Sequence, residues 1–335
     1  TDLGNHMTHS KQSAQDILAA RMAEIAKKNP RNVQRQPENE QQSKFQQSSN
    51  KAVVQSHLSP KRHPNADFFV IDVFDASLKD DLASMEHPIF ALKNGDTRNR
   101  FYEHNGNTVT IMPSSFGCAT IYDKDVWIYC ISALINAQNN NEPINRVVRF
   151  TAYDFLVSTN RNTSGRYYQL LREALFRLAG TRIITNVKTG NYRLESNFGL
   201  LDKVDIIYKD ETDENSPIIA IEVTLPDWLF RSIEAKQVKT ISADYFRLRK
   251  PLDRRIYELC AKHCGKQKEW HISLKILHRK SGSMATLRRF RQAIKELVVS
   301  NDLPDYRLTY DDKKDVLKVR NRDSSRFLGS IYKTT

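Results

Sequence analysis

The chain has 335 residues, of which 39% are hydrophobic, and its 52 basic and 39 acidic side chains give a net charge of +13. This length suffices for two ordinary domains. No run approaches the roughly 18 to 20 apolar residues that a membrane helix needs, and we expect no secretory leader. Four scattered cysteines are too few for a disulfide framework, which favours a reduced, cytoplasmic protein that does not act on a membrane.

The N-terminal fifth of the chain is polar. Residues 1–6 are typical of a cloning remnant, with Met7 as the expected native start. From residue 8 to about residue 66 there is too little apolar surface to offset the entropy lost on ordering. We therefore predict that residues 1–66 are a remnant and a disordered polar tail, with one isolated amphipathic helix at 16–28.

Residues 67–240 are predicted to form a first domain of mixed helix and strand. A strand-like segment at 68–76 and others between 84 and 118 come first, with Asn-Gly pairs marking turns. A mostly apolar helix at 123–139 and a short strand at 147–150 follow.

The centre of this first domain has the element order of a winged helix. Thr151 is expected to cap a brief helix, and a longer helix follows at 165–179. Two strand-like arms around residues 188–191 form a hairpin, which we interpret as the wing. Further strands around an acidic loop and a helix at 226–235 complete the domain.

The same order recurs in residues 241–335, the predicted second domain. Pro251 suits the first turn of a helix that ends at Gly265, and a short strand precedes a brief helix capped by Ser273. After a Ser-Gly-Ser turn, a longer helix with one apolar and one basic face leads into a hairpin. The predicted fold class is α+β, with two tandem winged-helix (helix-turn-helix) domains behind a disordered tail.

Positive charge is concentrated in one part of the chain. Between Arg231 and Glu296 there are 18 basic and 6 acidic residues, a net charge of +12, which is nearly the whole excess. Each Lys or Arg that neutralises a phosphate releases counterions, so this charge on a helical surface favours DNA. The major groove admits a helix whose Arg side chains pair with guanine and whose Gln side chains pair with adenine, which predicts specific reading of double-stranded DNA.

Candidate DNA contacts follow from position along the predicted reading helices. Early residues of such a helix usually reach the bases, a residue one turn later meets phosphate, and basic residues of the preceding helix and the hairpin tip touch the backbone. In the second domain these are Arg288, Arg289, Arg291 and Gln292, then Lys295, and finally Arg279, Lys280, Lys313 and Lys314. In the first domain the candidates are Arg161, Ser164, Arg166, Tyr167 and Gln169, with Lys188 on the wing. An exposed basic helix face is more often only solvated, but the neighbouring turn and hairpin favour DNA here.

Several segments carry a family resemblance: DVWIYCISALI, GRYYQLLREALFRLAGTRI and DYFRLRKPLDRRIYELCAKHCGKQKEWHISLKILHRKSGS, the last followed by a basic helix and NDLPDYRL. They resemble the plasmid replication initiator protein A family, over roughly residues 69–319. The resemblance implies two winged helices that bind repeated origin sites (iterons), local melting, and recruitment of the host initiator and replicative helicase. It also implies self-association, because dimers of related proteins often repress their own gene whereas monomers start replication.

Two other functions remain as alternatives. A dimeric transcriptional repressor would use the same DNA-binding parts and would lack only melting and helicase loading. An origin-nicking nuclease is less favoured, because the nine histidines include no His-x-His pair and Glu222 lacks the lysine that a carboxylate nuclease needs. No GxxxxGK phosphate loop is present either. We therefore expect no enzyme activity, no catalytic residue and no cofactor.

Two further patterns were weighed. Cys260, His263 and Cys264 are zinc-ligand types at helical spacing, but Ile256 and Leu259 share their face, so a buried apolar face is favoured and no metal is predicted. The family resemblance suggests that the strands between residues 69 and 112 pair across a dimer, but an ordinary sheet within one domain would produce the same sequence, so the sequence identifies no dimer surface.

Overall fold

The computed structural model of the protein describes residues 67–70, 88–104, 107–186, 195–210, 212, 216–236 and 238–322. All of them belong to one compact unit of the chain, which spans residues 54–335. The predictions for residues 1–66, namely a cloning remnant, a disordered tail and a helix at 16–28, lie outside the described residues.

A first group of six elements follows the predicted order. It comprises α3 (Lys124–Asn139), β4 (Val147–Phe150), α4 (Ala152–Ser158), α5 (Gly165–Gly180), β7 (Lys203–Tyr208) and β8 (Ile218–Thr224). The three strands form an antiparallel sheet in the order β4-β8-β7. Thr151 caps α4 as predicted, because its side chain accepts a hydrogen bond from the Asp154 amide at 3.0 Å.

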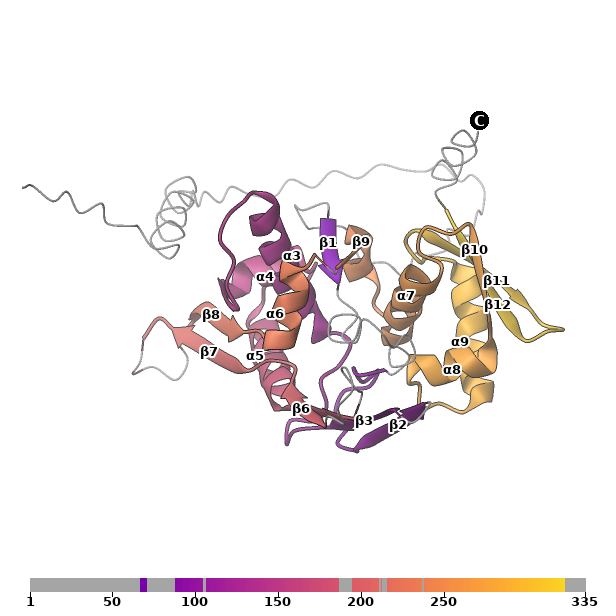
Figure 1. Cartoon of the computed structure of the whole chain (residues 1–335), viewed down its shortest axis with the longest axis horizontal. Helices are drawn as coiled ribbons and strands as arrows, with labels where there is room; N and C mark the ends of the chain where they lie inside the picture. The colour runs from indigo at the N-terminus through magenta and orange to yellow at the C-terminus, as the bar shows by residue number, and fades with distance from the viewer. Residues whose placement is uncertain are drawn as a thin grey trace, which may run out of the picture. The chain divides into compact units, whose positions relative to one another are not determined.

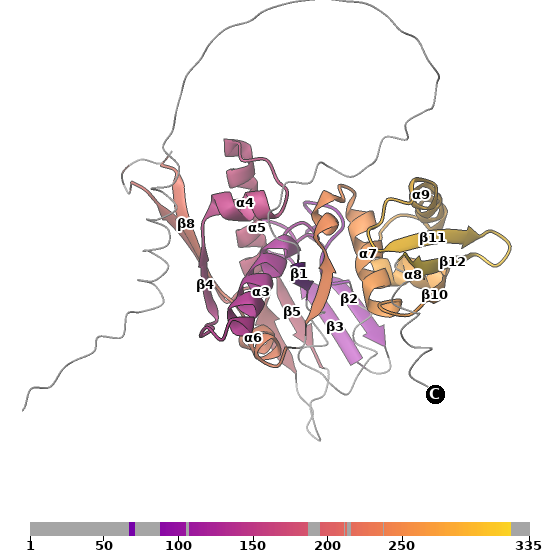
Figure 2. The ribbon, with the colours of Figure 1, turned by 90° about the horizontal axis from the view of Figure 1, so that it is seen from above.

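A second group repeats this order (Figures 1 and 2). It comprises α7 (Pro251–His263), β10 (Glu269–Ser273), α8 (Leu274–Ser281), α9 (Leu287–Ser300), β11 (Tyr306–Asp311) and β12 (Val316–Asn321). Its sheet has the order β10-β12-β11, so in both groups the third strand lies between the first and the second. We call the two sets the first and second modules.

The hairpin that we interpreted as the wing of the first domain belongs to another sheet. Its strands, β5 (Arg182–Thr185) and β6 (Ser196–Gly199), extend β2 (Arg100–His104) and β3 (Asn107–Met112) in the order β2-β3-β5-β6. Ile183 of β5 is buried and lies opposite the buried Ile111 of β3. This apolar cross-strand pair favours the pairing of β5 with β3 over a pairing with β4. In chain order, β5 and β6 thus stand between α5 and the strands β7 and β8, which form a sheet with β4 instead.

The remaining elements lie beside or between the two modules. They are β1 (Asp67–Val70), which pairs with β9 (Lys239–Ser242), together with α6 (Asp227–Glu234) and the 3-10 helix η2 (Ala243–Arg247). The boundary expected between residues 240 and 241 falls inside β9.

Two clusters of buried side chains stabilise the structure. One surrounds Trp127 and Phe155 of the first module, and the other surrounds Ile256 and Phe290 of the second. Ile128 of α3 packs in the second cluster, whereas Trp127 beside it packs in the first. Helix α3 therefore contributes apolar side chains to both cores.

Candidate nucleic-acid interface

Helix α9 is the most basic of the candidate reading helices. It begins after Thr286, whose hydroxyl accepts a hydrogen bond from the Arg289 amide at 3.4 Å. Phe290, Ile294 and Leu297 are buried at helical spacing and hold one face against the core. This packing turns the opposite face toward solvent.

The first turn of α9 presents two arginines without partners. Arg288 and Arg289 are exposed, and within the described residues neither guanidinium has a hydrogen bond or an ion pair. Gln292, one turn further on, is also exposed, and its amide donates to Glu296 at 3.2 Å. Positive charge in the first turn of a helix is unfavourable, because the N-terminal end of the helix dipole is itself positive. These two arginines therefore slightly destabilise α9.

Arg291 and Lys295, in contrast, are held by carboxylates at the tip of the hairpin β11–β12. The Arg291 guanidinium donates to both oxygens of Asp315, at 3.1 and 3.0 Å, and the Lys295 ammonium pairs with Asp312. Lys295 also lies over the ring of Tyr310, with 5.2 Å to the ring centroid. Neither carboxylate is among the predicted site residues, because the partners Arg291 and Lys295 are 24 and 17 residues away in the sequence.

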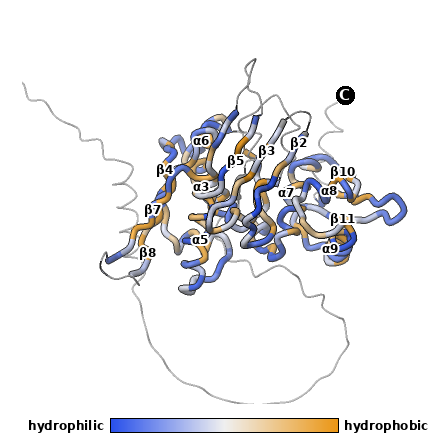
Figure 3. The backbone as a smooth tube through the Cα atoms, turned by 90° about the horizontal axis from the view of Figure 1, so that it is seen from below, coloured by the Kyte–Doolittle hydropathy of each residue, from blue (hydrophilic) through white to orange (hydrophobic). Residues whose placement is uncertain are grey.

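Lys313 and Lys314, at the same tip, are exposed and have no ion pair among the residues that the structure describes. Figure 3 shows this tip as hydrophilic. The predicted wing lysines therefore lie on the hairpin that also contacts α9.

Two of the predicted contacts are instead internal. Lys280 is only 7% exposed, and its ammonium nitrogen lies 3.4 Å from Nε2 of His263 on α7. Its carbonyl accepts a hydrogen bond from Arg255 at 2.9 Å, which joins α8 to α7. Arg279, its neighbour, is exposed.

The other internal residue is Arg161, whose side chain is 14% exposed. It donates to the Tyr122 carbonyl and to Asp125, both at 2.7 Å, and so points into the protein. Arg161 and Lys280 are therefore removed from the candidate interface.

In the first module, α5 carries the remaining candidates. Ser164 precedes this helix, and Ser164, Arg166 and Gln169 are exposed, whereas Tyr167 packs partly against the core. Lys188 lies outside the described residues.

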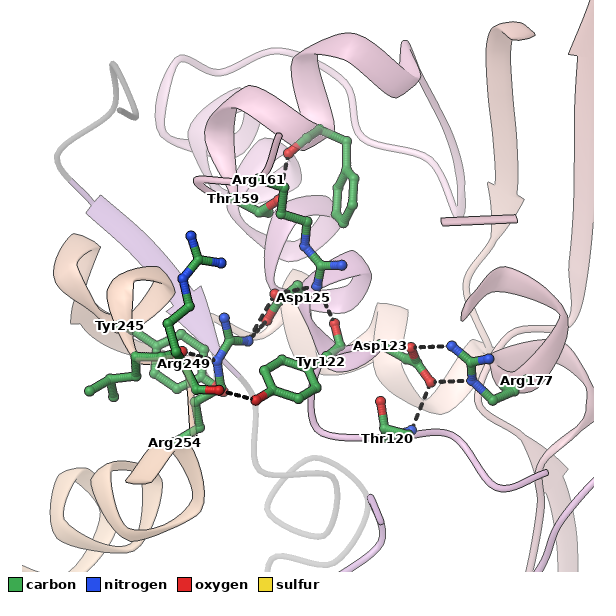
Figure 4. A network of polar contacts seen from close by, with 12 residues as sticks. Thr120, Tyr122, Asp123, Asp125, Thr159, Arg161, Arg177, Tyr245, Arg249 and Arg254 are labelled. Carbon is green, nitrogen blue, oxygen red and sulfur yellow. Dashed lines mark hydrogen bonds and ion pairs between the residues drawn. The ribbon is translucent and has the colours of Figure 1, made fainter. Parts of the chain in front are cut away.

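A buried network of charges joins the two modules (Figure 4). Asp125 of α3 is fully buried and accepts hydrogen bonds from Arg161 and from Arg254 of α7, the latter at 2.7 and 2.9 Å. The Arg254 guanidinium also lies over the rings of Tyr122 and Tyr245. Burial is the largest single effect and acts to lower the pKa of Arg254, but the neighbouring groups, with Asp125 first among them, together raise that pKa above its usual value.

The same network includes two further links. Tyr122 donates its hydroxyl hydrogen to the Arg249 carbonyl, and Lys124 pairs with Glu258 at 3.0 Å where both side chains are less than 10% exposed. Residues in and just before α3 thus bind residues in and just before α7, through two buried charge pairs and one hydrogen bond from Tyr122.

Cys260, His263 and Cys264, for which the sequence disfavours zinc, do not form a metal site in the described structure. Cys260 and Cys264 are buried, and burial is the main cause that raises the pKa of each thiol. The His263 ring stacks on Trp270, with 4.8 Å between centroids. Across the described part of the chain, no group of three His, Cys, Asp or Glu side chains is placed to hold a metal ion.

Comparison with known proteins supplies the functional class. Residues 79–308 match the family Replication initiator protein A. A protein of Wigglesworthia glossinidia brevipalpis, provisionally assigned as a replication protein, is 46% identical over 259 residues, which cover 76% of this chain and 94% of that protein.

Solved structures show more distant similarity. Domains 2 and 3 of RctB match with a TM-score of 0.54 and 13% identity, over 75% of this chain and 98% of that one, which shows a related fold. The Pi initiator protein, solved in complex with iteron DNA, matches with a TM-score of 0.42 and 16% identity, over 61% of this chain and 92% of that one.

The exposed arginines of α9 and the sequence matches together define a DNA-binding protein of plasmid replication. The chain belongs to the Replication initiator protein A family, as its resemblance to that family predicted. Among the described residues, no helix is both long and apolar enough to cross a membrane.

Proposed function

We propose that the chain starts plasmid replication by binding repeated origin sites (iterons) through two tandem winged helices. Both modules have the order helix, strand, helix, helix, strand, strand, and both sheets place the third strand in the middle. In this assignment α5 and α9 are the reading helices, and β7–β8 and β11–β12 are the wings. The repetition of one topology supports the assignment.

The observation that carries the proposal is the first turn of α9. Arg288 and Arg289 are exposed on a helix that packs against the core through Phe290 and Ile294, and they have no carboxylate partner among the described residues. An arginine in this state keeps its donor fork free for guanine O6 and N7, and Gln292 on the following turn is suited to adenine. In the first module Arg166 and Gln169 offer the same two residue types.

Two reading helices in one chain suit a site of about two helical turns. Successive major grooves on one face of DNA lie ~34 Å apart, so each module would read one groove. We propose that one chain binds one repeat in this way.

The later steps are proposed from membership of the family. Bound chains promote local melting of the origin and recruit the host initiator and the replicative helicase. The chain also self-associates: its monomers start replication, and its dimers repress the gene that encodes it. Each step proceeds by binding, without a catalytic residue, cofactor or membrane.

The proposal is tested by selecting sites from random duplex DNA and measuring affinity for the selected site at several salt concentrations. We expect one site of about two turns, a steep fall of affinity with salt, and a loss of roughly 1 to 3 kcal/mol for Arg288→Ala or Arg289→Ala. Unchanged affinity in the double variant would contradict reading by α9.

Other outcomes separate the alternatives. An inverted repeat bound only by two chains, without melting of a supercoiled origin plasmid, would favour a repressor. Open circles formed from that plasmid with Mg²⁺ would reveal a nicking enzyme.

A further inference from the structure

Asp315 closes the turn between β11 and β12 in an unusual backbone conformation. Its φ angle is +52°, in the left-handed region. Aspartate and asparagine tolerate this region better than other residues with a side chain, because their short polar groups bond locally. The residue is therefore suited both to the turn and to side-chain contacts beside it.

The contacts of Asp315 reach three neighbouring elements. Its carboxylate accepts two hydrogen bonds from Arg291 of α9, at 3.1 and 3.0 Å, and one from the hydroxyl of Tyr310 on β11. Its carbonyl oxygen accepts a hydrogen bond from the backbone amide of Leu274, the first residue of α8, at 2.9 Å. One residue of the wing thus binds both helices that precede it.

This arrangement occupies the side-on pair of N–H donors of Arg291, on Nε and Nη2. Nε and Nη2 face Asp315, and the Arg291 guanidinium is the main cause that lowers the pKa of the Asp315 carboxyl, so the pair is charged at neutral pH. This side-on contact fixes the orientation of the Arg291 guanidinium relative to the wing, and it does not itself use the end-on N–H donors on Nη1 and Nη2.

We propose that Asp315 is a positioning residue that fixes the reading helix α9 relative to the wing β11–β12, and that Arg291 is the residue of α9 through which it acts. The inference rests on the proposed function of α9. For Arg288 and Arg289 to reach the bases, α9 must enter the groove while the wing contacts the DNA backbone, which requires a fixed orientation of the helix relative to the wing. Contacts to phosphate carry no sequence information, so they do not depend on this orientation in the same way.

Asp312, three residues earlier in the same turn, provides a matched contrast. Its side chain is 70% exposed and pairs only with Lys295 among the described residues. This pair joins the turn to α9 alone, through one exposed contact, whereas Asp315 also binds Tyr310 and the first residue of α8. A phosphate of bound DNA competes with the exposed Asp312 for the lysine. Asp312 therefore competes with DNA phosphate for Lys295, whereas Asp315 holds α9 in the orientation that binding requires.

The test compares Asp315→Asn with Asp312→Asn on two duplexes of equal length, one with the selected site and one unrelated. Asparagine keeps the left-handed turn but loses the charge that binds Arg291. Because the pair is about one-third exposed, we expect Asp315→Asn to lose roughly 3- to 10-fold in affinity for the selected site and nothing for the unrelated duplex. Asp312→Asn should bind both duplexes equally well or more tightly.

Two further variants complete the design. Arg291→Ala should lose as much specificity as Asp315→Asn, measured as the ratio of the affinities for the two duplexes, and the double variant should lose no more than either, because both changes break one link. Thermal unfolding of each variant sets a binding temperature at which all are folded.

The outcomes are distinguishable. Equal losses on both duplexes, or full specific affinity in Asp315→Asn, would overturn the role of Asp315. Losses that add in the double variant would show that Arg291 and Asp315 act independently, and would overturn the proposed link. If the Arg288→Ala, Arg289→Ala double variant also binds the selected site fully, the proposed function itself fails.

Discussion

The basic residues around α9 differ in what surrounds each charge. Arg288 and Arg289 are exposed and unpaired within the described residues, Lys295 pairs with a carboxylate at the surface, and Lys280 is buried. A count of charges treats all four alike. Only their contacts separate residues that can reach bases or phosphates from a residue that supports the fold.

Lys295 should act through charge alone. Replacing it with alanine is expected to weaken binding to selected and unrelated DNA alike and to reduce the slope of log affinity against log salt by about 0.9. Titrations of both duplexes between low and moderate salt measure this slope. Lys93→Ala, an exposed lysine before β2, is the control and should leave it unchanged. A selective loss on the selected site would instead make Lys295 a base reader.

Burial of Lys280 could have been found from helical periodicity. Leu274 and Leu277 are buried at a spacing of three, and Lys280 continues this series on the same face of α8. Arg161 offered no such signal, because its partner Asp125 is 36 residues away in the sequence. Local patterns identify a face of a helix, and they do not identify a distant partner.

At the scale of elements, the second module was predictable because each helix has a local boundary signal. Pro251 opens α7, Ser273 precedes α8 and Gly282 ends it with a φ of +70°. The hairpin β5–β6 was misassigned because its sequence predicts two strands but not their neighbour. Pairing with β3 is a non-local choice, decided by the buried residues on both strands.

Gly282 provides a test of the turn between α8 and α9. A Cβ atom there would lie 2.6 Å from the Cβ of Pro88, in addition to the strain of a left-handed backbone. We expect Gly282→Ala to lower the free energy of unfolding by about 2 to 4 kcal/mol, measured by urea denaturation. Gly95→Ala is the matched control, since Gly95 has a φ of +73° and open space around its Cβ position. Equal losses in the two variants would show that the contact with Pro88 is unimportant.

At the scale of the whole molecule, the two modules are joined by buried charge. Asp125 accepts hydrogen bonds from Arg254 of the second module and Arg161 of the first, and both carboxylate oxygens are used. Buried ion pairs contribute little net stability, but they are costly to break, because the remaining charge has no water to solvate it. The network therefore favours one arrangement of the modules over arrangements that would separate these groups.

Asp125→Asn should consequently destabilise the protein far more than a surface change of the same kind. Loss of the carboxylate leaves Arg254, 3% exposed, without its counter-charge, so we expect a loss of about 3 to 5 kcal/mol in the free energy of unfolding. Asp202→Asn breaks a pair with Arg146 whose side chains are 34% and 40% exposed, and it should cost less than about 1 kcal/mol. Urea unfolding of both variants makes the comparison, and similar midpoints would show that the charges at Asp125 do not join the modules. Because the network lies away from Arg288 and Arg289, any fraction of Asp125→Asn that remains folded should still bind unrelated DNA, while binding of a site that needs both modules falls with the loss of their fixed arrangement.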